Sequence, residues 1–302
     1  MNPFYEALIE RDAAQARIAA ADVHGQERFL SVARFAVLAY APSQHGKHAL
    51  LACLAAYELR EELGPRYDDV LLECAIYAAE SRQPWSEPPI LEPPAPNDGA
   101  PEGFHDRLAA ERWLSRRWHN DGFARDYFRE AVHDFEDLGH SLIVANAAWK
   151  LAALLGEQGR YAVLRTGVWE MAAHRGEHYE EQGVALDSDS LATRLIDACV
   201  AADGEIVSAH NVFLLDAALA CGDAAVLRRV CDYLTSTTES APTVAPQPEA
   251  PMPDIPVYAL ARDCAATLKA HVVGRRLRAP RFIKAVDGNR LHGPSFAEWT
   301  FA

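Results

Sequence analysis

The chain has 302 residues, half of them hydrophobic, so it can bury a substantial core and does not have the composition of a disordered protein. Its 43 acidic side chains outnumber 29 basic ones and give a formal net charge of −14. This balance disfavours nucleic acid and anionic membranes as general partners, and we expect a globular protein that binds neither.

Apolar residues recur at helical spacing along most of the chain. The spacing predicts single helices at 3–21, 25–40, 104–118, 122–138, 190–203 and 258–276. It also predicts three helical hairpins, at 45–82, 140–175 and 206–236. No strand pattern is present in the sequence, so the predicted fold class is all-α. We expect repeated helical hairpins packed into one large helical domain over residues 1–236.

Two proline-rich segments interrupt the helical pattern. Proline excludes regular helix from residues 83–103, which are therefore expected to form a long loop. Residues 237–256, rich in Pro, Ala, Ser and Thr, are expected to form a flexible linker. The C-terminal helix and tail, 257–302, are then expected to pack on the main domain.

Each predicted hairpin begins with a histidine and turns at a glycine. The histidines are His48, His140 and His210, and the glycines are Gly64, Gly156 and Gly222. Glycine most readily takes the left-handed conformation with which many helices end. A single hairpin cannot bury both of its faces, so the copies are expected to stack. Stacking would bring the head histidines to equivalent places near the centre of the assembly.

Converging histidines predict a transition-metal site, because a neutral imidazole donates a lone pair to Fe, Zn or Cu. A lone histidine at a helix start is more often a cap or a core residue. The metal interpretation therefore depends on three of them sharing one position of the repeat. Two further candidates are His45, three residues before His48, and His271 in the last predicted helix. A purely structural role for the repeated histidines stays open.

Two other groups of titratable residues are interpreted as solvated surface. Glu130 and His133 have the spacing used in di-iron carboxylate bundles, but those bundles need the pair twice and it occurs once here. We interpret the segment from Glu130 to Asp137 as an exposed helix end. The same interpretation applies to Glu170, His174, Glu177 and His178.

Cysteine usage and the chain's first residues indicate a cytoplasmic protein. Six cysteines lie singly in apolar stretches and are interpreted as buried free thiols: Cys53, Cys74, Cys199, Cys221, Cys231 and Cys264. The N-terminal stretch has neither the basic nor the apolar region of a signal peptide. No uninterrupted apolar run reaches the roughly 18 residues of a membrane span. No nucleotide or flavin motif is found.

Four short motifs resemble the questin oxidase-like family. They are Ser43-Gln-His45-Gly-Lys-His48-Ala-Leu, Gly139-His140-Ser-Leu-Ile, Ala209-His210-Asn-Val and Leu268-Lys269-Ala-His271. The resemblance implies a mononuclear non-haem Fe(II) site held by these histidines, with O2 and an aromatic polyketide-like small molecule as substrates. It implies oxidation or opening of a quinoid ring. Lys269 could be a ligand only as a carbamate, because an ammonium has no lone pair.

Two other functions remain as alternatives. The repeats are also typical of a helical scaffold that binds a protein partner without catalysis. The stretch from His140 to Gly156 is similar to the first helix of HD-type metal-dependent hydrolases, but the later His-Asp pair is replaced here by His174-Arg175. We favour the oxygenase because the head histidines begin the most apolar helices. The oligomeric state is open, and a homodimer is compatible with the sequence.

Overall fold

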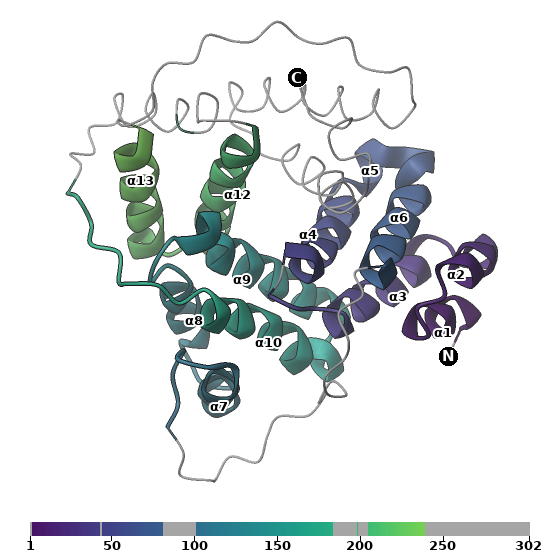
Figure 1. Ribbon diagram of the computed structural model, residues 1–302, viewed down its shortest axis with the longest axis horizontal. Helices are drawn as coiled ribbons and strands as arrows, with labels where there is room; N and C mark the ends of the chain where they lie inside the picture. Colours follow the sequence, from purple (N-terminus) through teal and green to yellow (C-terminus); the bar gives the residue numbers. More distant parts are fainter. Residues whose placement is uncertain (1, 43, 81–100, 184–197, 199–204, 239–302) are drawn as a thin grey trace, which may run out of the picture. The chain divides into compact units, whose positions relative to one another are not determined.

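The computed structural model describes residues 2–42, 44–80, 101–183, 198 and 205–238 (Figure 1). Regular structure within these residues is entirely helical, which confirms the predicted all-α class. They divide into two compact units. The first unit is drawn from Met1–Pro93 and Ala147–Thr166, and the second from Pro94–Asn146 and Gly167–Pro251. Most of the predicted loop 83–103 and linker 237–256, and the whole of 257–302, lie outside the described residues.

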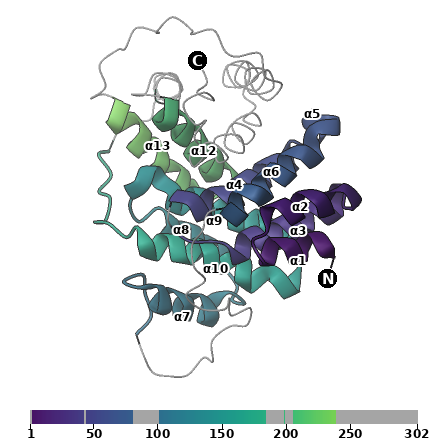
Figure 2. The same cartoon turned by 45° about the vertical axis from the view of Figure 1, so that its right-hand side comes forward.

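The first unit is built on three mutually contacting helices, α3 (Gly25–Leu38), α4 (Gln44–Glu58) and α6 (Tyr67–Glu80). The smaller helices are α1 (Pro3–Ile9), α2 (Ala13–Ala19) and α5 (Arg60–Leu63), with 3-10 turns η1 (Ala20–Asp22) and η2 (Gly64–Arg66). Helix α1 contacts α2 and α3, and α2 also contacts α6; Figure 2 shows these helices close together. The rings of Phe29 and Tyr57 stack at 4.2 Å between α3 and α4.

The single helix predicted at 3–21 is wrong, because the chain breaks between α1 and α2. Arg11 has a left-handed φ of 57°, which ends α1. Asp12 then accepts a hydrogen bond of 2.9 Å from the Gln15 amide and caps α2. The periodicity of apolar residues continues across this break and gives no sign of it. The feature that indicates the start of a new helix is the N-cap residue Asp12.

The second unit contains α7 (Arg107–Arg117), α8 (Phe123–Ala131), α12 (Glu205–Cys221) and α13 (Ala224–Thr238). It also contains the first part of α9 (Glu136–Leu155) and the last part of α10 (Glu157–Ala173). Helices α12 and α13 contact each other as a hairpin, and α8 contacts α13 (Figure 1). The helix predicted at 122–138 is too long, since α8 ends at Ala131.

The predicted glycine joints all have a positive φ, with values of 53°, 75° and 70° at Gly64, Gly156 and Gly222. Gly64 departs from the predicted left-handed helical conformation, because its ψ is −126°. The repetition of three equal hairpins is not confirmed, because α5 and η2 intervene between α4 and α6. Glycine thus correctly located the ends of helices, while the equivalence of the three copies stays a prediction.

Close packing in the second unit depends on one glycine within α10. A Cβ on Gly167 would collide with the hydroxyl of Tyr127 on α8 and lie 3.3 Å from the Cα of Ala145 on α9. Tyr127 is fully buried, and burial raises its pKa. The absence of a side chain at Gly167 therefore lets α8, α9 and α10 approach at this point.

The four cysteines of the described chain for which a state is given are free thiols, and Cys53, Cys74 and Cys231 are buried. This agrees with the prediction, whereas Cys199 and Cys264 lie outside the described residues. Helix α9 is the one described helix long and apolar enough to cross a membrane, with a mean hydropathy of 1.3. Because 67% of that stretch is buried, it also has the character of a core helix.

An arginine on α13 ties the segment after α10 to the end of α8. Nε of Arg229 donates to the Val132 carbonyl at 2.5 Å, and its Nη2 donates to the His133 carbonyl at 2.9 Å and to the Tyr179 carbonyl. The Tyr179 hydroxyl donates to the buried Asp232 at 2.8 Å. These bonds hold residues 174–182 in place, and this segment includes His174.

Protonation of His133 should destabilise the second unit. Burial lowers the pKa of His133 below 6.5, and the neighbouring charges of Arg175 and His178 lower it further against the opposing effect of Asp134 and Glu130. The folded chain therefore binds fewer protons here than the unfolded chain. Stability should fall as pH drops through about 6.5 and be unaffected by this group at higher pH.

Denaturant unfolding at pH 7.5 and 5.5 would test this expectation. The H133Q variant should lose less stability between the two pH values than the unaltered protein. The control is H119Q, since His119 is exposed. Equal losses of stability between pH 7.5 and 5.5 in H133Q and in the unaltered protein would show that His133 does not cause the pH dependence.

Candidate metal centre

Helix α9 begins with three consecutive left-handed residues. Asp137, Leu138 and Gly139 have φ values of 48°, 58° and 75°, and the right-handed helix proper starts at His140. The left-handed conformation costs an L residue about 1–2 kcal/mol, so Asp137 and Leu138 hold it only because their surroundings require it. Gly139 is needed for space as well, because a Cβ there would lie 2.8 Å from a methyl carbon of Leu214.

This left-handed turn, Asp137–Gly139, fixes the orientation of the His140 imidazole. Nδ1 of His140 lies 2.5 Å from the Asp137 carbonyl oxygen and 3.3 Å from its carboxylate Oδ2. A carbonyl oxygen only accepts, so Nδ1 carries the proton and Nε2 presents a lone pair. Metal-binding histidines commonly have such a carbonyl or carboxylate behind the ligating ring. His140 is 3% exposed, and its lone pair is therefore directed within the protein.

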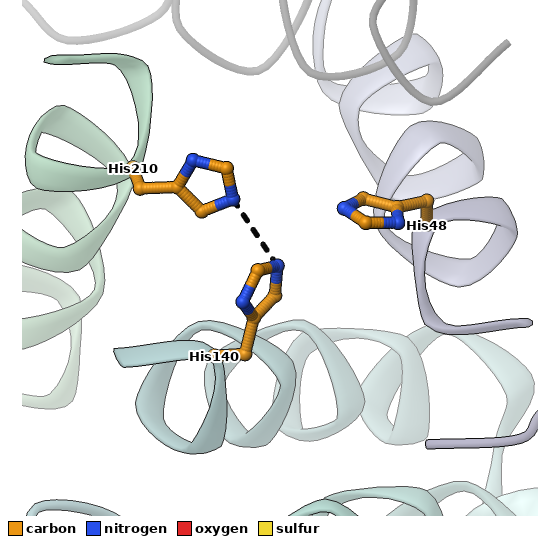
Figure 3. A group of neighbouring side chains, drawn as sticks. All are labelled: His48, His140 and His210. Carbon is orange, nitrogen blue, oxygen red and sulfur yellow. Dashed lines mark hydrogen bonds between the residues drawn. The ribbon is translucent and has the colours of Figure 1, made fainter. Parts of the chain in front are cut away.

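Nε2 of His140 faces a second imidazole within the same unit. Nε2 of His210, on α12, lies 3.2 Å from Nε2 of His140, and the two rings meet edge to face (Figure 3). His210 is 2% exposed. Two nitrogens each about 2.1 Å from one ion, at an angle between about 90° and 109°, would be about 3.0–3.4 Å apart. The observed spacing therefore fits either a shared metal ion or a direct histidine–histidine hydrogen bond.

The structure places the other predicted ligands as follows. His48 is buried in the N-terminal part of α4 and belongs to the first unit. His45 lies on the first turn of α4, and its side chain is outside the described part of the chain. Lys269 and His271 are also outside it. Of the predicted set, the pair within one unit is thus His140 and His210.

The sequence interpretation of Glu170 as surface is wrong. Glu170 is fully buried on α10, and its Oε1 lies 3.7 Å from Nε2 of His174. The same His174 nitrogen lies 3.7 Å from Oδ2 of Asp137. These three residues form a second group of potential ligands within the second unit. The end of α10 is thus less exposed at Glu170 than the sequence predicted.

The segment from Glu130 to Asp137 is also not simply a solvated helix end. Asp134 is 6% exposed and accepts hydrogen bonds from the amides of Glu136 and Gly176 at 3.0 and 3.2 Å. Glu130 pairs with Arg175 at 2.9 Å, and His133 faces His178 with their Nδ1 atoms 3.2 Å apart. Glu130 and His133 therefore have partners other than a shared di-iron centre.

The space requirement at Gly139 is testable by substitution. The G139A variant should lower the melting temperature more than G156A, because both glycines have a φ of 75° but only Gly139 faces a neighbour, the side chain of Leu214. A second substitution, L214A, should remove the clash and make the G139A change less costly than it is alone. Thermal unfolding followed by circular dichroism measures this. If G139A and G156A lose equal stability, Leu214 does not constrain the turn.

Comparisons with family models, with curated proteins and with solved structures gave no match. The resemblance to the questin oxidase-like family therefore stays a prediction from short motifs.

Proposed function

We propose that His140 and His210 hold a transition-metal ion and that the protein is a mononuclear non-haem iron oxygenase. The observation that carries the proposal is the approach of two buried imidazole Nε2 atoms to 3.2 Å, with Nδ1 of His140 already committed to Asp137. A neutral imidazole pair is a donor set that suits Fe, Zn, Ni and Cu. The residues therefore fit a metal ion of this class.

A mononuclear site needs further ligands, and His48 is the candidate for the third. In the predicted repeat it occupies the position equivalent to His140 and His210, and it is 3% exposed. His45, His271 and a carbamylated Lys269 are additional candidates from the resemblance alone. Three histidines leave positions open on an octahedral ion for substrate and O2.

The choice of iron and of an aromatic polyketide-like substrate comes from the family resemblance. Iron(II) with open positions would supply the binding and reduction of O2. The protein itself fixes the orientation of the ligands and limits the access of water to them. His140 is held in one tautomer by Asp137, and both histidines are at most 3% exposed. Such a preorganised, buried donor pair suits chemistry from which water must be excluded.

Removal of either histidine should abolish metal binding at the His140–His210 centre without unfolding the protein. We expect H140A and H210A, prepared from cells supplied with iron, to contain about one metal ion per chain less than the unaltered protein. The reason is that each variant leaves only one imidazole of the pair. H48A should lose metal as well if His48 is the third ligand. Elemental analysis gives the metal content, and circular dichroism checks the helicity.

The matched control is H119A, which removes an exposed histidine far from these residues in sequence. It should keep full metal content. Full occupancy in H140A or H210A would show that the residue is not a ligand. A chain that contains zinc would favour the hydrolase, and a folded chain without any metal would favour the scaffold.

Oxygen consumption tests the reaction class. The iron-loaded protein should consume O2 when an anthraquinone-like or other polycyclic phenol is added, and H210A should show no consumption above the chelator-treated protein. An oxygen electrode with product analysis by mass spectrometry makes the measurement, with incorporation of labelled oxygen as the readout. Iron-loaded protein that consumes no O2 with any member of such a panel would contradict the oxygenase.

A further inference from the structure

A second polar cluster of the second unit lies directly behind His140. Asp137 belongs to the left-handed turn, Glu170 to the last turn of α10, and His174 follows that helix directly. One donor atom from each lies within 4.8 Å of the other two. The side chain of Glu170 is fully buried, and those of His174 and Asp137 are about 30% exposed, at 29% and 30%.

The spacing within this cluster differs from that of hydrogen-bonded pairs. Nε2 of His174 is 3.7 Å from Oε1 of Glu170 and 3.7 Å from Oδ2 of Asp137. Hydrogen bonds between such atoms are about 2.7–3.2 Å long. Ligand atoms about 2.1 Å from one ion are about 3.0 Å apart when adjacent and about 4.2 Å apart when opposite. The observed distances of 3.7 Å lie between these two values and are compatible with a common ion.

The charges of this cluster point the same way. The carboxylates of Glu170 and Asp137 both lie 3.7 Å from the same nitrogen, Nε2 of His174. Two carboxylates brought together repel, and a divalent cation between them would offset both charges.

We propose that Asp137, Glu170 and His174 form a second binding site, for a divalent first-row transition-metal ion such as Mn²⁺, Fe²⁺, Co²⁺ or Zn²⁺. Two carboxylate oxygens and one imidazole are a mixed donor set that suits these ions better than Ca²⁺ or Cu⁺. This second site does not depend on the proposed function. It adjoins the His140–His210 centre, because Asp137 contacts Nδ1 of His140 through both its carbonyl and its carboxylate.

Cobalt binding to the full-length, chelator-stripped protein tests the site. The expected result is two Co²⁺ per chain by elemental analysis after gel filtration, with visible absorption bands from two ligand sets. H174A and E170Q should each bind one Co²⁺, and H210A should bind one with the complementary spectrum. His174 is partly exposed, so H174A is the variant expected to fold, and circular dichroism verifies this. H119A is the control and should bind two.

The outcomes separate the two sites. If H174A and E170Q bind as many Co²⁺ ions as the unaltered chain, with unchanged spectra, the second site is overturned. If they lose one ion while H210A loses none, the second site stands and the proposed His140–His210 centre fails. If the unaltered chain binds one Co²⁺ that H210A loses and H174A keeps, only the first centre exists.

Discussion

The constraint on which the candidate centre depends is the left-handed turn that precedes His140. A helix that began in the ordinary way would leave the imidazole of its first residue without a partner behind it. The turn instead folds Asp137 back so that its carbonyl oxygen receives Nδ1–H at 2.5 Å. Two non-glycine residues hold an unfavourable backbone to achieve this. Strain of this kind persists where the surrounding packing enforces it, and it is concentrated at functional sites.

Packing around the turn holds Asp137–Gly139 in the left-handed conformation. Leu214 of α12 fills the space where a side chain at position 139 would lie, and α12 also carries His210. Asp134 caps the chain just before the turn and bonds the Gly176 amide just after α10. The same contacts therefore align His140 with His210 and bring His174 towards Asp137. Changes in this region affect both groups of potential ligands together.

Several titratable side chains are buried in the described part of the second unit. Glu111, Asp134 and Asp232 accept hydrogen bonds from neutral donors. His140 and His210 face each other, and Glu170 faces His174, which adds to the cost of burying these groups. A metal ion would convert such juxtapositions into a favourable interaction, and metal binding would then contribute to folding stability.

The sequence by itself determined the all-α class, the glycines at which helices end and the choice of His48, His140 and His210 as candidate ligands. These follow from local rules, namely apolar periodicity, the left-handed preference of glycine and the equivalence of positions in a repeat. The sequence prediction was wrong where a cap interrupts the periodicity, at Asp12, and where a charged residue near a helix end is buried, at Glu170. Only the tertiary structure decided that Asp137 orients His140 and that Glu170 and His174 lie beside it. Those contacts depend on a backbone conformation held by residues distant in sequence, such as Leu214, which lies 75 positions after Gly139, and no local pattern encodes them.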